Sequence, residues 1–397
     1  MKSSKYAVVL GLLSAVGPFA IDMYLPALPA ISADLDASTA ATQMTLMVFF
    51  VTFGVAQIAY GPISDTVGRR APLFFGLGVF ALGGLGCALS PSIDWLIFFR
   101  FVQGLGAAAC AITPRAIVRD LHTGIEAARL MSTIMLVFSV APILAPMVGS
   151  AIVPFGWRAV FGMITLVALL GILLVVTLLP ETLPPEKRKP LGLRSMGASF
   201  GTLFRDFNFM SLTFIGGLGL SSFFAFIANA SFIYIDHYGM TPLQFSLAFS
   251  VNAIGFIGAS QFAPKLAARH GFNRVVMAAV TSFMALSLLL LALTALGFTS
   301  LVVLMSGLFL AFACLGLVLP SSMVMALEDH GRIAGVASAL GGTLQMLTGA
   351  AMVGVASLFF DGTPLPMVGI IAICSVGAFI LARMTLRPRD RAPAAAE

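Results

Sequence analysis

Residues 61–70 read Gly61-Pro62-Ile63-Ser64-Asp65-Thr66-Val67-Gly68-Arg69-Arg70 and form a charged turn between two long apolar stretches. Only 10% of the chain is charged, 59% is hydrophobic, and the mean hydropathy is +1.03. Soluble domains contain roughly 45–50% apolar residues, so most of this chain is expected to lie in lipid. The composition therefore predicts a polytopic membrane protein.

The apolar runs set the number of membrane crossings. A run of about 20 residues crosses a hydrocarbon core of roughly 30 Å as a helix, and a barrel would need an alternation of polarity that these runs lack. The sequence therefore predicts an all-α polytopic membrane protein with twelve transmembrane helices. The predicted spans are 6–28, 40–61, 71–90, 93–117, 129–153, 157–179, 209–231, 243–264, 274–297, 299–325, 333–357 and 364–386.

Lysine and arginine residues indicate the orientation, because they are enriched in cytoplasmic loops. Arg158 is alone in one set of alternate loops, whereas nearly all other cationic residues fall at the termini or in the opposite set. We therefore expect a multi-pass protein of the bacterial cytoplasmic (inner) membrane with both termini in the cytoplasm. The net charge of +6 then reflects topology and contact with anionic membrane lipid, and no nucleic-acid partner is needed.

A polar stretch divides the chain near its middle. Offsetting the second half by roughly 200 residues brings Ala263-Pro264 onto Gly61-Pro62 and aligns their basic loops, as expected for two bundles related by an axis along the membrane normal. We predict two pseudo-symmetric six-helix bundles. The predicted units are an N-terminal bundle (1–180), a cytoplasmic linker (181–208), a C-terminal bundle (209–386) and a cytoplasmic tail (387–397).

Several function classes find no support in the sequence. No Gly-Lys-Ser/Thr phosphate loop occurs, so an ATP-driven pump is not expected from this chain. The four cysteines lie in apolar spans without ligand spacing, so neither metal nor cofactor is predicted. Linker and tail are too short for a soluble domain, so neither an enzyme nor a receptor is expected. Most glycines are expected to serve helix packing, for example Gly76, Gly78, Gly83, Gly84 and Gly86.

Two charged residues lie within predicted spans and away from their edges, Asp22 in the first and Arg100 in the fourth. A charge within a span costs about 2.5–3.5 kcal/mol or more, so each needs a partner or a function. A carboxylate that alternates between a proton and a cationic partner is the minimum machinery for proton coupling, and we assign that role to this pair. Two simpler alternatives stay open: Asp22 as the cap of a broken helix, and Arg100 as a tie to backbone carbonyls.

Polar and aromatic residues on the same helix faces are candidates for a substrate cavity. Helical spacing places them near Asp22 and Arg100 or along the seventh span. Packing with one internal hydrogen bond is the competing explanation for each of them. The candidates are Tyr24, Gln103, Gly104, Ser222, Phe226 and Asn229.

At the level of motifs, the whole chain resembles the major facilitator superfamily. The loop at 61–70 is similar to that family's loop 2–3 signature, Gly-x-x-x-Asp-x-x-Gly-Arg-Arg/Lys. The resemblance implies a cytoplasmic gate in which Asp65 interacts with the start of span 11. The matching residues are Gly61, Asp65, Gly68, Arg69 and Arg70.

Two further motifs point to a branch of that superfamily. The stretch from Leu96 to Ala108 resembles the family's span 4 motif, in which the arginine, here Arg100, is associated with proton coupling. Residues 141–150 resemble the antiporter motif of span 5, with alanines replacing two glycines and serine replacing the last glycine. The antiporter positions are Ala141, Pro142, Ala145, Pro146 and Gly149.

Together with Asp22-Met23-Tyr24-Leu25-Pro26 and Trp157-Arg158, these motifs resemble the Bcr/CflA branch of twelve-span drug:proton antiporters. The resemblance implies a proton-coupled multidrug efflux antiporter. A single twelve-span chain needs no partner to form a path, so we expect a monomer. Its expected substrates are small amphiphilic compounds of the phenicol, bicyclomycin or sulfonamide kind, moved by rocker-switch alternating access. A proton-coupled importer of a nutrient or metabolite on the same fold is the alternative.

Overall fold

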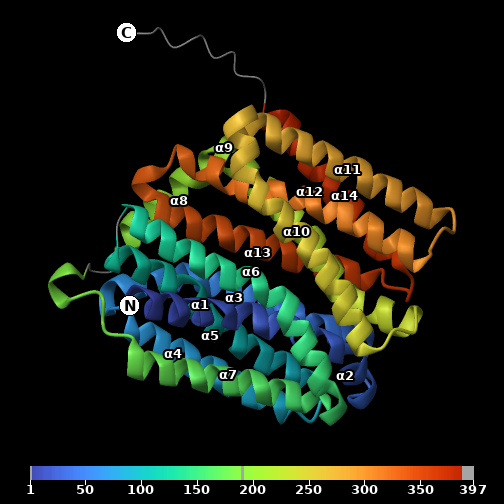
Figure 1. Cartoon of the computed structure of the whole chain (residues 1–397), viewed down its shortest axis with the longest axis horizontal. Helices are drawn as coiled ribbons and strands as arrows, with labels where there is room; N and C mark the ends of the chain where they lie inside the picture. Colours follow the sequence, from blue (N-terminus) through green and yellow to red (C-terminus); the bar gives the residue numbers. More distant parts are fainter. Residues whose placement is uncertain (1, 123, 189–191, 387–397) are drawn as a thin grey trace, which may run out of the picture.

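The computed structural model describes residues 2–122, 124–188 and 192–386, and within these ranges it consists of helices and their connections without any strand. Twelve helices in the described ranges are long and apolar enough to cross a membrane. Figure 1 shows them packed side by side. The predicted all-α, twelve-span fold class is confirmed. The predicted tail at 387–397 lies outside the described residues.

The first half holds six spans. The first consists of α1 (Lys2–Asp22), the short 3-10 helix η1 (Leu25–Ala27) and α2 (Leu28–Asp34). The other five are α3 (Thr39–Val67), α4 (Arg70–Ala88), α5 (Ile93–Leu121), α6 (Gly124–Ile152) and α7 (Trp157–Leu178).

The second half repeats this layout. Its first span is α9 (Phe207–Ser231), continued by the π-helical segment η4 (Phe232–His237). The others are α10 (Pro242–His270), α11 (Phe272–Ala295), α12 (Leu301–Glu328), α13 (Ala334–Leu358) and α14 (Pro364–Thr385). α7 ends close to the predicted boundary at 180, and α9 begins close to the predicted boundary at 209. The division into two folding units stays a prediction.

The first span differs from its prediction as one continuous run over 6–28. The helix ends at Asp22, and the chain resumes as η1 and α2. Pro26 and Pro29 have no backbone N–H to donate to a preceding carbonyl, which favours a break in this stretch. Proline alone does not impose one, since α6 continues through Pro142 and Pro146. The break places Asp22 and Tyr24 at the end of a helix instead of in its middle.

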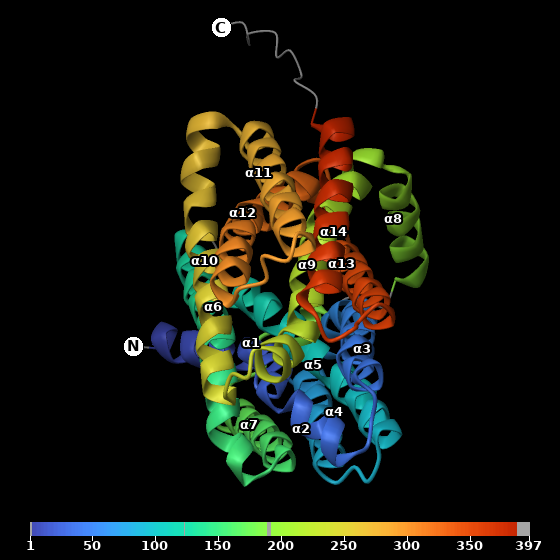
Figure 2. The ribbon, with the colours of Figure 1, turned by 90° about the vertical axis from the view of Figure 1, so that its right-hand side faces the viewer.

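The linker contains a helix that the sequence analysis did not predict. After the short helix η3 (Pro185–Lys187), α8 (Leu193–Arg205) packs against α9 and α13. Figure 2 shows α8 at the rim of the second half. Its apolar and polar residues are segregated at helical spacing, and at 13 residues it is too short for a span.

The molecule has two ends, which are defined by the loops that they carry. The linker end carries residues 67–70, 120–122, 179–188, 192–206, 270–272 and 328–333. The far end carries residues 34–39, 88–93, 152–157, 237–242, 295–301 and 358–364.

On one side of the molecule the halves meet along α3, which packs against α9 and α13. Gln43 Nε2 donates to the Ala228 carbonyl (3.1 Å) and to Asn229 Oδ1 (3.0 Å). Near the middle of α3, Thr343 Oγ1 donates to the Gly54 carbonyl (2.7 Å). These contacts join the halves from the far end to the middle of the spans.

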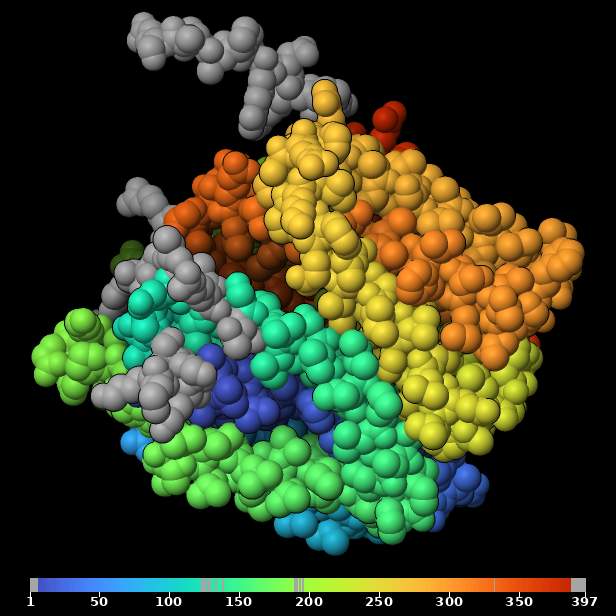
Figure 3. Space-filling view, in the orientation of Figure 1, coloured from blue at the N-terminus to red at the C-terminus, as the bar shows by residue number. Residues whose placement is uncertain are grey.

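On the other side the halves meet where α6 packs against α10. Ser246 Oγ donates to the Pro146 carbonyl (2.8 Å), and Ser250 Oγ donates to the Ile143 carbonyl (3.2 Å). Both contacts lie in the part of α6 that approaches the far end. Nearer the linker end, Figure 3 shows a hollow between the two halves beside α10.

Close packing within the first half depends on glycines, as predicted for most of them. A Cβ on Gly106 of α5 would overlap the backbone of Gly76 and Phe80 of α4, and a Cβ on Gly76 would lie 2.9 Å from the Gly106 carbonyl oxygen. Gly78 differs, because a Cβ there would meet nothing within 4 Å. The α4–α5 contact is therefore made by backbone against backbone.

We expect Gly106→Ala to lower the thermal unfolding midpoint of the purified protein, because an extra methyl in a packed interface costs about 1–3 kcal/mol. Gly78→Ala is the matched control. It adds the same methyl on the neighbouring helix in open space and should leave the midpoint unchanged or raise it, since Ala favours helix over Gly by about 1 kcal/mol. Equal midpoints for the two variants would refute the packing account.

Candidate transport site and charged loop

The charged loop joins α3 to α4 at the linker end. Gly68 has a φ of +103°, a conformation that glycine adopts without strain, and this turns the chain sharply between the two helices. The Arg69 side chain then lies against the ends of α3 and α5. Its Nη1 contacts Asp65 Oδ1 at 2.6 Å, and its Nε contacts Asp120 Oδ2 at 2.6 Å. Arg69 therefore ties the end of α3 to the end of α5.

The surroundings of Arg69 keep it charged. Its own burial favours the neutral form, but the hydrogen bonds from its guanidinium to Asp120 and Asp65 outweigh burial and raise its pKa above the ordinary value. Asp65 was expected to interact with the start of span 11. Among the described residues the ion pair of Asp65 is with Arg69, so the gate contact to α13 stays a prediction for another state of the protein.

Glu181 binds the backbone of this loop, a contact that was not predicted from the sequence. Its carboxylate accepts hydrogen bonds from the backbone N–H of Arg69 (2.9 Å), Arg70 (3.1 Å) and Leu183 (3.0 Å). The first two belong to the start of α4, where backbone N–H groups have no partner within the helix. Its partial burial opposes ionisation, but the hydrogen bonds from these backbone N–H groups lower the pKa of Glu181 below its usual range. The sequence feature that could have indicated this contact is an acidic residue shortly after the sixth span.

Arg100 lies in the middle of the first half and is fully buried. Its Nη1 donates to the Ala20 carbonyl of α1 (3.0 Å) and to Gln103 Oε1 (2.5 Å), and its Nε donates to the Thr45 carbonyl of α3 (3.4 Å). Within the described part of the chain, Nη2 has no hydrogen-bond partner. Arg100 therefore joins α5 to α1 and α3, and part of its donor capacity is unused.

Asp22 is the last residue of α1 and is 4% exposed. Among the described side chains no ion pair joins it to Arg100, and the arginine ion pairs there are made by Arg69 and Arg158. Arg100 binds the backbone carbonyl of Ala20, two residues before Asp22. The two charged residues therefore lie near one helix end, and among the described residues no hydrogen bond or ion pair joins them.

The span 5 motif lies on α6 where α6 meets both α1 and the second half. Ala141 and Ala145 are buried, and the Pro146 carbonyl accepts the hydrogen bond from α10. A Cβ on Gly149 would overlap the Met23 carbonyl, directly after Asp22. Small residues thus allow close contact at the break in the first span.

The six residues predicted for a substrate cavity are all buried in this structure. Tyr24 and Gln103 surround Arg100. Gly104 packs against α3, since a Cβ there would lie 2.8 Å from the Phe49 carbonyl oxygen. Asn229 takes part in the Gln43 contact between the halves.

Ser222 donates to the Leu218 carbonyl (3.1 Å), and Phe226 belongs to an aromatic cluster with Phe223, Phe249 and Phe312. Packing and internal hydrogen bonds occupy all six positions here. Substrate contact by these residues stays a prediction.

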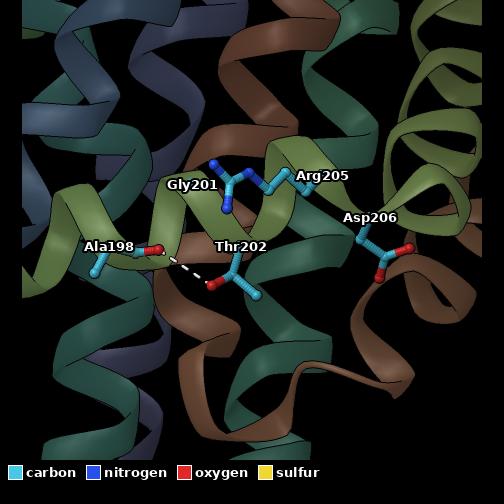
Figure 4. A pocket seen from close by; sticks show the side chains of 5 residues that line it. All are labelled: Ala198, Gly201, Thr202, Arg205 and Asp206. Carbon is cyan, nitrogen blue, oxygen red and sulfur yellow. Dashed lines mark hydrogen bonds between the residues drawn. The ribbon is translucent and has the colours of Figure 1, made fainter.

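A separate pocket of about 530 Å³ lies at the linker end and is lined by α8 and by Asp206, which follows it. Figure 4 shows its lining, in which Thr202 donates to the Ala198 carbonyl (3.1 Å). Asp206, at its edge, caps α9 through Asn208 N (2.8 Å) and contacts His330 Nε2 (2.8 Å). These contacts fasten the linker to the second half.

Comparison with known proteins identifies the family. A model of the Major Facilitator Superfamily matches residues 10–353. The chain belongs to this superfamily. The predicted resemblance is confirmed, and the chain is a multi-pass membrane protein of the bacterial inner-membrane type.

Two relatives from bacteria cover most of the chain. It is 38% identical over 347 residues to the uncharacterized MFS-type transporter YdgK of Bacillus subtilis, with 86% of each chain covered. It is 33% identical over 375 residues to the bicyclomycin resistance protein homolog of Haemophilus influenzae, with 94% of this chain and 93% of the relative covered.

A third relative and one solved structure complete the comparison. Multidrug resistance protein D of Escherichia coli is 29% identical over 340 residues, covering 85% of this chain and 84% of the relative. The crystal structure of a D-xylose-proton symporter superposes with a TM-score of 0.74 at 16% identity, covering 96% of both chains, and shows the fold alone.

We expect Glu181→Gln to lower the thermal unfolding midpoint at neutral pH. A carboxyl with a lowered folded-state pKa contributes stability above its unfolded-state pKa and loses that contribution as the pH falls through the folded-state value. The difference between wild type and variant should therefore shrink as the pH falls below about 4.3, the ordinary value for glutamate.

Glu186→Gln is the control, because Glu186 lies exposed in the same linker, in η3. Melting curves of the purified proteins between about pH 3.5 and 7.5 provide the measurement. A difference for Glu181→Gln that is the same at every pH, or that Glu186→Gln reproduces, would contradict the capping role.

Proposed function

We propose that this protein is a proton-coupled efflux antiporter for small amphiphilic compounds. The observation that carries the proposal is the extended similarity to proteins named for resistance to bicyclomycin and to multiple drugs. Asp22 and Arg100, both buried near the break in the first span, support the proposal. Ionisable residues inside membrane spans are typical of proton and substrate pathways.

The proposed transport cycle is alternating access between the two halves. We place the linker end in the cytoplasm, because cationic residues gather there. The hydrogen bonds of α3 and α6 to the second half then close the outer side, and the hollow near the linker end gives access from the cytoplasm. Release of substrate outside requires these contacts to separate while the linker end closes.

Asp22 is the proposed proton carrier. A buried carboxylate without a cationic partner is costly unless it takes up a proton. Uptake from the outer side and release to the cytoplasm would let the inward proton flow drive export. One charge moving through 100 mV supplies about 2.3 kcal/mol, which sustains a gradient of roughly fortyfold at 1.4 kcal/mol per factor of ten.

Arg100 and the motif residues have proposed roles in the same cycle. Arg100 would respond to the protonation of Asp22 through the end of α1, where it binds the Ala20 carbonyl. The charged loop with Asp65 and Arg69 would form the cytoplasmic gate when the linker end closes. Gly149 and the span 5 prolines would let α6 move closely against α1 and α10.

We expect Asp22→Asn and Arg100→Ala each to abolish drug-dependent proton release. The assay uses inverted vesicles with an acidified interior, a fluorescent pH probe, and chloramphenicol, bicyclomycin and ethidium added one by one. Asp94→Asn is the control, because Asp94 is an exposed carboxylate in the first turn of α5.

Expression and elution of each variant as a monodisperse protein show that it is folded. Drug-dependent proton release that persists in Asp22→Asn would contradict the carrier role. If no compound moves protons in wild type, and a metabolite is instead taken up along an inward proton gradient, the exporter proposal fails and the importer replaces it.

A further inference from the structure

The guanidinium of Arg100 lies between two aromatic rings. Its central carbon is 4.4 Å from the ring centroid of Tyr24 and 4.3 Å from that of Phe49. All three side chains are fully buried. A cation over the face of an aromatic ring is attracted by the ring quadrupole, and the attraction is strongest away from water. In the described residues no ion pair joins Arg100 to a carboxylate, so the two rings add to the stabilisation that its hydrogen bonds provide.

Each ring is itself fixed by the helices around it. The Tyr24 hydroxyl is 3.1 Å from Thr45 Oγ1 of α3, and its ring centroid is 5.6 Å from that of Phe161 of α7. Phe49 is stacked on Phe53 one turn along α3, with ring centroids 5.9 Å apart. The positions of the two rings, and with them the space that the guanidinium occupies, are therefore set by α3 and by the break after α1.

From its position beside the two rings, Arg100 donates a hydrogen bond to a backbone carbonyl at the end of α1. The last four carbonyls of an α-helix have no donor within the helix, and Ala20 supplies one of these four. Arg100 Nη1 donates to it at 3.0 Å. A positive charge at the C-terminal end of a helix is also favoured by the helix dipole. If the guanidinium rotated away from the rings, its hydrogen bond to the Ala20 carbonyl, two residues before Asp22, would break.

We propose that Phe49 is a positioning residue for proton coupling: with Tyr24 it holds the Arg100 guanidinium on the end of α1, without contact to substrate. The inference rests on the proposed function. Movement of the α1 end, when the proton on Asp22 is gained or lost, is then transmitted to α5 through one hydrogen bond. The titratable groups that interact with this guanidinium are the Tyr24 phenol and the Cys87 thiol of α4. Among the described residues, Asp22 makes no ion pair or hydrogen bond with it and would act on it only through the α1 end.

The test compares Phe49→Leu, Phe49→Tyr and Phe80→Leu with wild type. Phe80→Leu removes an equally buried ring from the first half, and Phe80 makes no cation contact in the described residues. Drug-dependent proton release is measured in inverted vesicles with the compound that is active on wild type. Equilibrium binding of that compound and its exchange across the membrane without a proton gradient are measured on the same preparations.

We expect Phe49→Leu to lower proton release at least tenfold while binding and exchange stay within twofold of wild type. Phe49→Tyr keeps the ring and should restore release, and Phe80→Leu should leave it unchanged. The inference is overturned if Phe49→Leu releases protons normally, if it loses drug binding in parallel, or if Phe80→Leu shows the same loss. A wild type without any drug-dependent release would instead overturn the proposed function.

Discussion

The hydrocarbon core of a membrane leaves a charge few ways to be stabilised, and this constraint governs the centre of the molecule. Arg100 is buried without an acidic partner in the described part of the chain. Its charge is satisfied by backbone carbonyls, one amide oxygen and two aromatic faces. That arrangement requires a helix end inside the first half, and the break after Asp22 provides it. The break, the arginine and the carboxyl thus form one structural unit.

This unit lies next to the surface where the halves meet. Met23 follows the broken helix and packs on Gly149 of α6, and α6 is hydrogen-bonded to α10 of the second half. Because interiors are close-packed, a shift of the α1 end has to be accommodated by its neighbours. A change of charge at Asp22 therefore has a short physical route to the contacts that close the far end. The charged loop at the linker end is built separately, around Arg69 and Glu181.

The sequence predicted the twelve spans and their order because length and hydropathy are local properties that lipid makes decisive. It singled out Asp22 and Arg100 as charges inside apolar runs, and both are buried in the structure, while their role in proton coupling stays a prediction. It did not predict the aromatic sandwich, since Tyr24, Phe49 and Arg100 come from three spans and only packing brings them together. Glu181 and α8 were missed for another reason: neither a cap nor a short surface helix is an apolar run. The amphipathic spacing of α8 was readable in the sequence. Pro26 and Pro29 favoured the break in the first span without fixing it, since α6 continues through two prolines.

Alternating access requires the contacts at the far end to open when the linker end closes. Distances between spin labels measure this movement, with one pair at Ser38 and Gln244 toward the far end and a second pair at Val67 and His270 of the linker end. We expect transported drug and a change of pH to lengthen the first distance and shorten the second in the same population of molecules. Distances that stay the same under every condition, or that lengthen together, would contradict it.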